Sequence, residues 1–248
     1  MYQKERIDSI LEILKANGYV TVKFLTENLH YSTATINRDL NVMEKQKLVQ
    51  RSYGGVELIK REGVALPFRY HKMKSAKAKI GKAAADLVED GDVIFIDGST
   101  TTEFMGKNLL NKKDITVITN NLAMVTFLSE YGIEVCCLGG KVVEKPYMLD
   151  GNDTVENAMK YNADKMFFST SAISDGGVIS SASGYYLLHK VMAANSKKRY
   201  YLADHEKINV NSPMNLFDLS DIDAIITDYI FSDDTKSEYK NTQFIEVK

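Results

Sequence analysis

The sequence predicts an α/β protein with an N-terminal winged helix-turn-helix, followed by an α/β domain with a largely parallel sheet. Two patterns indicate this. Residues 1–58 read as three short amphipathic helices and a hairpin, whereas from about residue 77 onward apolar runs alternate with helices. The chain of 248 residues is long enough for one small and one mid-sized domain. We therefore expect a winged helix-turn-helix at 1–58, a basic linker at 59–76 and an α/β domain at 77–248.

The N-terminal pattern is that of three helices with recognisable ends. Asn17-Gly18 is a good left-handed C-terminal cap for the first helix. Thr21 and Ser32 can each accept a hydrogen bond from an early backbone N–H, and so can cap the second and third helices. Apolar residues recur at helical spacing and give each helix one buried face: Ile7, Ile10, Leu11 and Leu14; Phe24, Leu25 and Leu29; Ile36, Leu40 and Met43.

The third helix leaves polar residues facing outward at its start. These residues are Thr33, Thr35, Asn37 and Arg38. Side chains of these kinds reach phosphates and base edges in a major groove. Leu48–Ser52 and Val56–Leu58 flank a Tyr53-Gly54-Gly55 turn, as in the hairpin of a winged helix-turn-helix. We interpret this part as a DNA reader, and the alternative is a small helical cap domain without a DNA role.

Charge is distributed unevenly along the chain. Residues 1–82 hold 16 Lys and Arg against 8 Asp and Glu, a net charge of +8, and residues 83–248 hold 15 against 25, a net charge of −10. Between Lys60 and Lys82, Glu62 is the only acidic residue. Such a run is often a solvated linker, but beside a helix-turn-helix it favours attraction to DNA phosphates. The acidic half would be repelled, so one end of the molecule should dock on DNA.

Composition excludes several other classes. No apolar run approaches a membrane span, and the charged N-terminus is unlike a signal peptide, so we expect a cytoplasmic protein. Cys136 and Cys137 are adjacent in an apolar run, where we expect buried thiols in a strand and neither a disulfide nor a metal site. The sequence indicates no cofactor.

Six apolar runs predict the strands of the larger domain. They are 93–97, 115–119, 134–138, 165–169, 199–204 and 224–228. Helical segments, including Leu122–Glu130 and Tyr186–Asn195, separate most of them. Continuous apolar strands alternating with helices are typical of a parallel sheet covered on both faces.

Polar residues follow five of these runs, at the edge of the sheet where ligands of open α/β proteins bind. The five segments are 97–102, 119–121, 139–141, 169–171 and 204–207. In the first, Asp97-Gly98-Ser99-Thr100-Thr101-Thr102 offers hydroxyls and backbone N–H groups that suit an oxyanion such as phosphate. Polar residues at strand ends commonly just cap the next helix, but five converging ends predict a small-molecule site.

Residues 1–58 resemble the DNA-binding domain of the DeoR-type transcriptional regulators, bacterial repressors of sugar metabolism. The matching pieces are Arg6-x3-Ile10, Gly18-Tyr19-Val20-Thr21-Val22, Ser32-x2-Thr35-Ile36-x-Arg38-Asp39-Leu40 and Leu48-Val49-x-Arg51-x2-Gly54-Gly55. The resemblance implies that Ser32, Thr33, Thr35, Asn37, Arg38 and Arg51 bind DNA. Tyr31 stands where valine is usual, and Asn37 where arginine is usual. Asn37 should change the bases that are read, because asparagine favours adenine and arginine favours guanine.

Residues from about 66 to 230 resemble the effector domain of the same family. The matching pieces are Pro67-Phe68, Ile80-Gly81-x-Ala83-Ala84, Gly91-Asp92-x-Ile94, Thr119-Asn120, Gly139-Gly140, Ala163-Asp164-Lys165, Ala203-Asp204-x2-Lys207 and Ile226-Thr227-Asp228. That domain is similar in fold to ribose-5-phosphate isomerase and glucosamine-6-phosphate deaminase, and binds phosphorylated sugars.

The resemblance also implies residue roles in this domain. Ser99, Thr100, Thr101 and Lys207 would hold the phosphate, with Asp97 and Asn120 on sugar hydroxyls. The sequence departs from the family pattern at three places. Gly98 and Ser99 are exchanged, His205-Glu206 replaces Ser-Ser, and Ser181–Tyr186 lacks a usual glutamate. These departures point to an atypical effector or a decayed site.

We therefore expect a DNA-binding transcriptional regulator, a repressor in its usual form, whose operator affinity is controlled by a phosphorylated sugar. A single reading head buries little DNA, so a homo-oligomer is expected on double-stranded operator DNA. The alternative is a sugar-phosphate isomerase or deaminase with an accessory DNA-binding domain. Such an enzyme needs a base, and beyond Asp97 no carboxylate follows Ser169–Ile173 until Asp175, while the four histidines form no cluster. We assign no catalytic residue and no metal ligand. A third possibility, a ligand-blind architectural DNA binder, leaves the polar strand ends unexplained.

Overall fold

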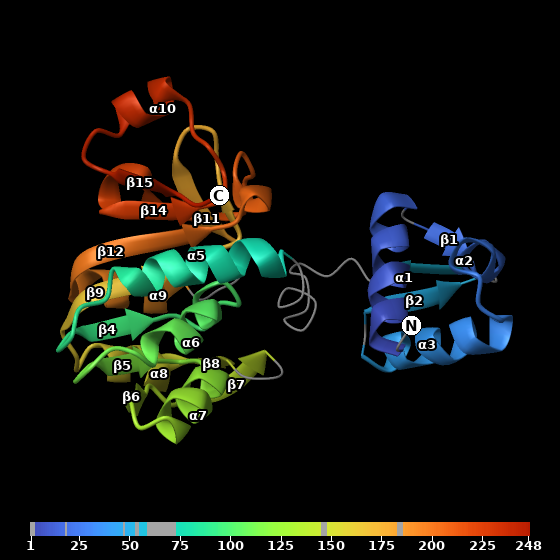
Figure 1. Ribbon diagram of the computed structural model, residues 1–248, viewed down its shortest axis with the longest axis horizontal. Helices are drawn as coiled ribbons and strands as arrows, with labels where there is room; N and C mark the ends of the chain where they lie inside the picture. Colours follow the sequence, from blue (N-terminus) through green and yellow to red (C-terminus); the bar gives the residue numbers. More distant parts are fainter. Residues whose placement is uncertain are drawn as a thin grey trace. The chain divides into compact units, whose positions relative to one another are not determined.

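The computed structural model describes residues 3–17, 19–46, 48–52, 55–58, 73–144, 148–182 and 186–248. The chain divides into two compact units, Met1–Glu62 and Gly63–Lys248 (Figure 1). Most of the predicted linker lies outside the described residues. Its last residues, Lys74 to Ala76, already belong to the first helix of the second unit.

The first unit has the predicted helices and hairpin. Its elements are α1 (Gln3–Asn17), β1 (Tyr19–Thr21), α2 (Val22–Leu29), α3 (Thr33–Lys45), β2 (Val49–Ser52) and β3 (Gly55–Leu58). β2 and β3 pair antiparallel as the wing. β1 adds a third strand beside β3 that the sequence did not predict. Of the predicted Tyr53-Gly54-Gly55 turn, the first two residues lie outside the described part of the chain, and Gly55 is the first residue of β3.

Both predicted N-terminal caps of this unit are present, and the C-terminal cap predicted at Asn17-Gly18 includes a residue outside the described part of the chain. The Thr21 hydroxyl accepts from the N–H of Phe24 at 3.1 Å, and the Ser32 hydroxyl accepts from the N–H of Thr35 at 3.2 Å. Each bond satisfies one backbone donor that the first helical turn leaves open. The buried apolar residues of this unit are Ile10, Leu11, Leu14, Val20, Leu25, Ile36, Leu40, Met43, Val49 and Val56. The expectation that Phe24 is buried was wrong, because it is 38% exposed; Phe24 and Leu25 point about 100° apart around α2, and Leu25 is the one that is buried. Ile7 and Leu29 are half-buried.

The second unit is built on a seven-stranded sheet in which every pair of neighbouring strands is parallel. The order is β15-β14-β12-β9-β4-β5-β6. The strands are β4 (Val93–Ile96), β5 (Thr116–Thr119), β6 (Glu134–Cys137), β9 (Ala163–Phe168), β12 (Ser196–Ala203), β14 (Ala224–Thr227) and β15 (Gln243–Glu246). The sequence predicted six of these strands, and β15 at the edge was missed.

Helices cover both faces of this sheet (Figure 1). On one face lie α5 (Lys74–Asp86), α6 (Gly106–Leu109) and α7 (Leu122–Glu130). On the other lie α8 (Asn152–Ala158) and α9 (Tyr186–Ala194). Alternation along β4 explains both cores, because Ile94 and Ile96 pack toward the first face and Phe95 toward the second.

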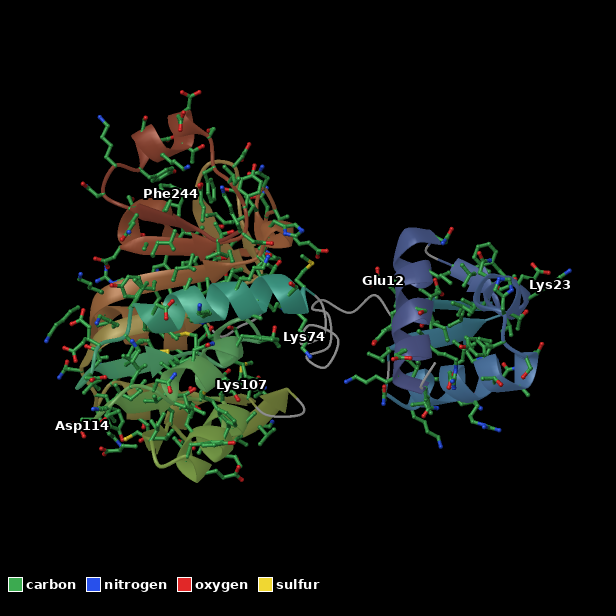
Figure 2. All side chains as sticks on the ribbon, viewed as in Figure 1. Glu12, Lys23, Lys74, Lys107, Asp114 and Phe244 are labelled. Atoms are coloured by element: carbon green, nitrogen blue, oxygen red, sulfur yellow. The ribbon has the colours of Figure 1, made fainter. Side chains whose placement is uncertain are left out.

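Smaller elements complete the unit. They are the hairpin β7 (Lys141–Glu144) and β8 (Met148–Asp150), the antiparallel sheet β10 (Ala172–Ile173), β11 (Val178–Ser181) and β13 (Met214–Asp218), the helix α10 (Asp233–Glu238), and the 3-10 helices η1 (Thr102–Met105), η2 (His205–Lys207) and η3 (Leu219–Asp221). Figure 2 labels Phe244 on β15, whose ring lies 5.0 Å from that of Phe231.

The expectation of two buried thiols was wrong. Cys136 and Cys137 do lie in a strand, but Cys136 is only half-buried and Cys137 is exposed. The reason is that β6 is an edge strand, so only one neighbour flanks it. Within the described part of the chain, no helix combines the length and apolar composition needed to cross a membrane.

Candidate functional site

The start of α3 carries the predicted DNA-reading side chains. Ser32, Thr33 and Arg38 are exposed, and Thr35 and Asn37 are half-buried. Ser32 also caps the helix and bonds the Thr35 hydroxyl at 2.9 Å, so its role is at least partly structural. The structure thus brings five of the six predicted DNA-binding residues to one helix end.

Arg51, the sixth, reaches α3 from the wing strand β2. Its guanidinium donates to Asn41 Oδ1 at 2.9 Å and to Asn37 Oδ1. Because the amide oxygen of Asn37 accepts from Arg51, the part of this amide that remains available to another partner is its N–H side. A two-bond contact with adenine uses both ends of the amide, so the predicted adenine contact requires Arg51 to move.

Asp39, which follows Arg38 in α3, has a structural role. Asp39 is fully buried and accepts two hydrogen bonds from Arg6 of α1, Nε to Oδ2 at 2.7 Å and Nη2 to Oδ1 at 3.1 Å. Gln3 adds a third bond at 2.9 Å. The hydrogen bond and charge of Asp39 raise the pKa of Arg6 above its ordinary value. The guanidinium also lies 5.2 Å from the ring centre of Tyr31, which accounts for an aromatic residue at this unusual position.

A cavity opens where the strand order of the large sheet reverses. From β4 the chain continues to β5 and β6 on one side, and returns to β9 on the other. The loops after β4 and β9 therefore diverge, and open α/β sheets bind ligands at such a point. The cavity is lined by Asp97, Gly98, Ser99, Thr100, Asn120, Met148, Ser169, Thr170, Ser171, Ser181, Leu188 and His189.

Four of the six predicted effector-binding residues line this cavity, namely Asp97, Ser99, Thr100 and Asn120. Thr101 and Lys207 are not in its lining. Lys207 Nζ instead donates to the Thr101 hydroxyl at 3.0 Å and to the Ser169 hydroxyl at 2.6 Å. Ser169 lines the cavity, so Lys207 is connected to the cavity through this serine. Lys207 also links the loop after β4 to the loop after β9.

Asp97 is held by donors on both carboxylate oxygens. Oδ2 accepts from the N–H of Ser169 at 3.2 Å and lies 2.9 Å from His189 Nε2. Oδ1 accepts from the Thr102 hydroxyl at 2.8 Å and from the N–H of Ser99 at 3.3 Å. Burial by itself raises the pKa of Asp97, but His189, Thr102 and Ser169 together hold it below its ordinary value. Asp97 is thus an ionised residue that organises the cavity.

His189 is a residue that the sequence analysis missed. It comes from α9, 92 positions after Asp97, and is 7% exposed. The sequence placed it among four unclustered histidines, and no local motif joins it to Asp97. The one available signal was its helical spacing to Met192 and Ala193 on the apolar face of α9, since a polar ring on such a face needs a partner.

Asn120 is clamped to β8. Its side-chain Nδ2 donates to the backbone carbonyl of Leu149 at 2.8 Å, and its backbone carbonyl accepts from the N–H of Leu149 at 2.9 Å. Met148, next along β8, lies against Gly98, where an added Cβ would sit 2.5 Å from the Met148 side chain. The exchange of Gly98 and Ser99 relative to the family pattern therefore makes room for Met148.

A second lysine meets the hydroxyl loop from α5. Lys77 is 3% exposed, and its Nζ donates to the Thr100 hydroxyl at 3.0 Å. From the sequence, Lys77 was predicted only as part of the basic run between Lys60 and Lys82, whereas its helical spacing to Ile80, Gly81 and Ala84 places it on the buried face of α5. It therefore belongs to the larger unit's interior, and adjacent threonines in one loop each accept from a lysine.

The remaining strand ends do not line the cavity. Gly139 and Gly140 have positive φ, and a Cβ on Gly140 would lie 2.0 Å from Thr154 Oγ1, so this turn packs on α8. His205 Nδ1 lies 2.6 Å from Asp228 Oδ2, and Glu206 is exposed. Among the described residues, no group of three His, Cys, Asp or Glu side chains could hold a metal ion.

Both units match families of known proteins. Residues 6–62 match the DeoR-like helix-turn-helix domain, and residues 72–229 match the DeoR C terminal sensor domain. The chain belongs to the DeoR family. It is accordingly a DNA-binding transcriptional regulator with a C-terminal sensor domain, and the resemblance noted in the sequence is confirmed.

Several DeoR-family relatives match over nearly their whole length. The HTH-type transcriptional repressor GlcR of Bacillus subtilis is 34% identical, covering 92% of this chain and 89% of that protein. The glycerol-3-phosphate regulon repressor of Escherichia coli is 29% identical, covering 92% of each chain. The lactose phosphotransferase system repressor of Staphylococcus aureus is 29% identical, covering 100% of this chain and 99% of that protein.

Solved structures are more distant. Ribose 5-phosphate isomerase A from Methanocaldococcus jannaschii has a TM-score of 0.42 and 18% identity, covering 55% of each chain. The eIF2B beta subunit from Chaetomium thermophilum has a TM-score of 0.47 and 16% identity, covering 78% of this chain and 53% of that one. At these values neither similarity bears on function.

Proposed function

We propose that this DeoR-family regulator is a repressor of a sugar-metabolism operon and that a phosphorylated sugar controls its affinity for operator DNA. The sugar would bind in the cavity after β4 and β9. The relatives support this proposal, because two are named for the glycerol-3-phosphate regulon and the lactose phosphotransferase system. Action on operator DNA also implies a cytoplasmic protein.

The proposal that the ligand is phosphorylated rests on one arrangement of side chains. Lys77 and Lys207 donate to the adjacent hydroxyls of Thr100 and Thr101, so two cations flank the loop that follows β4. Ser99 and Thr100 of that loop line the cavity. A phosphate there would accept from the hydroxyls and gain from both positive charges, since charge-assisted hydrogen bonds are stronger than neutral ones.

The alternative of an isomerase or deaminase is not favoured by the state of Asp97. A general base works best with a pKa near the working pH, whereas burial raises the pKa of Asp97 and hydrogen bonds from His189, Thr102 and Ser169 hold it below its ordinary value. Its lone pairs are also committed to those donors. The cavity is thus suited to holding a sugar phosphate and not to removing a proton from it.

The test uses the full chain and a panel of aldose and ketose phosphates with three to six carbons. The operator is first selected from random DNA. We expect one or more sugar phosphates to raise the melting temperature and to change operator affinity, without being converted. The proposal is wrong if no sugar phosphate of the panel changes the melting temperature or the operator affinity. Conversion of a sugar phosphate to a product would instead support the enzymatic alternative.

We further propose that the regulator works as a homo-oligomer. One helix-turn-helix unit buries too little DNA surface for tight, selective binding, and paired half-sites are the usual solution. Light scattering should give a mass of at least two chains, and operator affinity should fall steeply with added salt as counterions are released. A monomer that binds equally well at low and high salt would contradict this proposal.

A further inference from the structure

Arg51 of the wing strand β2 is held against the reading helix α3 by two asparagine side chains. Its Nη1 donates to Asn41 Oδ1 at 2.9 Å, and its Nη2 donates to Asn37 Oδ1. The two asparagines are four positions apart, about one helical turn, so their oxygens can meet the two terminal nitrogens of one guanidinium. The Arg51 guanidinium therefore lies alongside α3, although its backbone belongs to the wing.

This place on α3 borders the face that a helix-turn-helix turns toward the major groove. Around the helix, Asn41 projects about 60° from Arg38, and Asn37 about 100° from it. The side chains of Arg38, Asn41 and Arg51 are exposed, and that of Asn37 is half-buried. The buried face of α3 is formed by Ile36, Asp39, Leu40 and Met43. Arg51 thus adds a second guanidinium to the exposed surface that carries Arg38.

The two bonds leave Arg51 able to bind a further partner. A guanidinium has five N–H donors, and the bonds to Asn37 and Asn41 use one N–H of each terminal nitrogen. Both acceptors are neutral amides, so these bonds do not neutralise the positive charge of Arg51. In the major groove, the edge of guanine presents two acceptors, O6 and N7, which match two donors of one guanidinium.

We propose that Arg51 reads a guanine in the major groove beside α3, and that Asn37 and Asn41 are positioning residues that direct its guanidinium. This assignment concerns the DNA-binding unit and does not depend on an effector. It replaces the adenine contact expected of Asn37, because that contact needs Asn37 Oδ1, the atom that accepts from Arg51. A long side chain that is held in place before binding loses less conformational entropy when it meets the base.

The test measures base preference as well as affinity. The operator is selected from random DNA with the wild-type full chain, and each of its base pairs is then replaced in turn in competition binding. Arg51→Ala should lose about tenfold of the preference for one G·C base pair. Arg51→Lys keeps the positive charge without the planar fork, so it should lose the same preference while retaining more of the affinity.

A modified base tests the contact from the side of the DNA. Each guanine of the operator is replaced in turn by 7-deazaguanine, which lacks the N7 acceptor. At one guanine this change should weaken binding of the wild-type protein and leave binding of Arg51→Ala unchanged. The comparison in the wild-type protein needs no substitution, so it remains informative if a variant unfolds.

Asn37→Ala and Asn41→Ala test the positioning role. Each should weaken the preference at the base pair that Arg51 reads. In the Arg51→Ala background, neither substitution should have a further effect at that base pair, because the side chain that the asparagines position is absent. Gln50→Ala is the matched control. It removes a hydrogen bond of 2.7 Å to Glu57 Oε1 on the opposite face of β2, so every base preference should stay as in the wild-type protein.

Three results would overturn this assignment. Arg51→Ala could weaken binding equally at every operator base pair, with no guanine sensitive to 7-deaza substitution, which would assign the guanidinium to a phosphate. Asn37→Ala could relax an A·T base pair by a factor that multiplies with the effect of Arg51→Ala, which would assign Asn37 to a base of its own. Both asparagine variants could keep the full preference for guanine, which would show that Arg51 needs no positioning.

Discussion

Arg6 and Asp39 join α1 to α3 through two hydrogen bonds between a nearly buried guanidinium and a fully buried carboxylate. The reading helix is thereby fixed to the rest of its unit at a point next to its exposed face. Two consecutive residues of α3 consequently divide their roles. The Arg38 side chain is exposed to solvent, whereas the buried Asp39 side chain bonds Arg6 of α1.

The first prediction tests the structural half of this division. Arg6→Ala leaves the buried carboxylate of Asp39 with Gln3 as its one remaining side-chain donor among the described residues, so the variant should be less stable than the wild-type protein. Urea unfolding of the full chain should show this loss when it is followed by a spectroscopic signal that reports only on residues 1–62. A variant as stable as the wild-type protein would mean that the pair contributes no more than a surface ion pair.

The second prediction concerns Arg38. Arg38→Ala should weaken operator binding by about 1–3 kcal/mol, because it removes one contact to a phosphate or a base edge. Fluorescence anisotropy with the selected operator measures the affinity, and thermal unfolding provides the control. The melting temperature should stay near that of the wild-type protein, since the Arg38 side chain is exposed. A variant that unfolds would assign Arg38 to the fold.

The third prediction concerns pH. Asp228 raises the pKa of His205 above its ordinary value of 6.5. A raised folded-state pKa means that the pair stabilises the protein fully below about pH 6.5, and that this contribution is lost as pH rises through the folded-state pKa. The His205 side chain is 48% exposed, so solvent screening keeps the effect under about 1 kcal/mol.

Denaturant unfolding of the wild-type protein and of His205→Gln checks this sign. The difference in free energy of unfolding should be largest near pH 5.5 and should vanish by about pH 9. Asp228→Asn should remove the same pH dependence. A difference that grows toward high pH would show that the pair acts through the neutral ring.

Local spacing was sufficient to predict much of the fold. The caps at Thr21 and Ser32 and the apolar face of Ile36, Leu40 and Met43 depend on residues within one or two helical turns, and all are present. Six strands of the sheet could be predicted for the same reason, because a buried parallel strand is itself a continuous apolar run. The edge strand β15 is only half-buried along most of its length, so it lacks that signal.

The side-chain pairs that build the two sites could not be predicted in this way. Arg6 and Asp39 are 33 residues apart, and His189 and Asp97 are 92 apart. Lys77 and Thr100 are 23 residues apart, on α5 and on the loop after β4. The family resemblance placed the hydroxyl loop and Asn120 in the effector site, but it carried no information about residues peculiar to this chain. Met148 over Gly98 is one such feature.

The last prediction concerns the link between effector and DNA. Lys207 joins Thr101, after β4, to Ser169, after β9, so a ligand between these loops would favour one arrangement of the two strand ends. Lys207→Ala removes that link together with a positive charge near the phosphate. It should abolish the effect of a sugar phosphate on operator affinity, and leave binding of the unliganded protein to DNA nearly unchanged, because Lys207 belongs to the second unit.

The matched control is Lys197→Ala, which removes an exposed lysine paired with Asp164 and should respond like the wild-type protein. Reciprocity adds a second measurement: in the wild-type protein, operator DNA must change the affinity for the effector by the same factor as the effector changes the affinity for DNA. If Lys207→Ala still responds normally to a sugar phosphate in the DNA-binding assay, Lys207 has no part in the effector site.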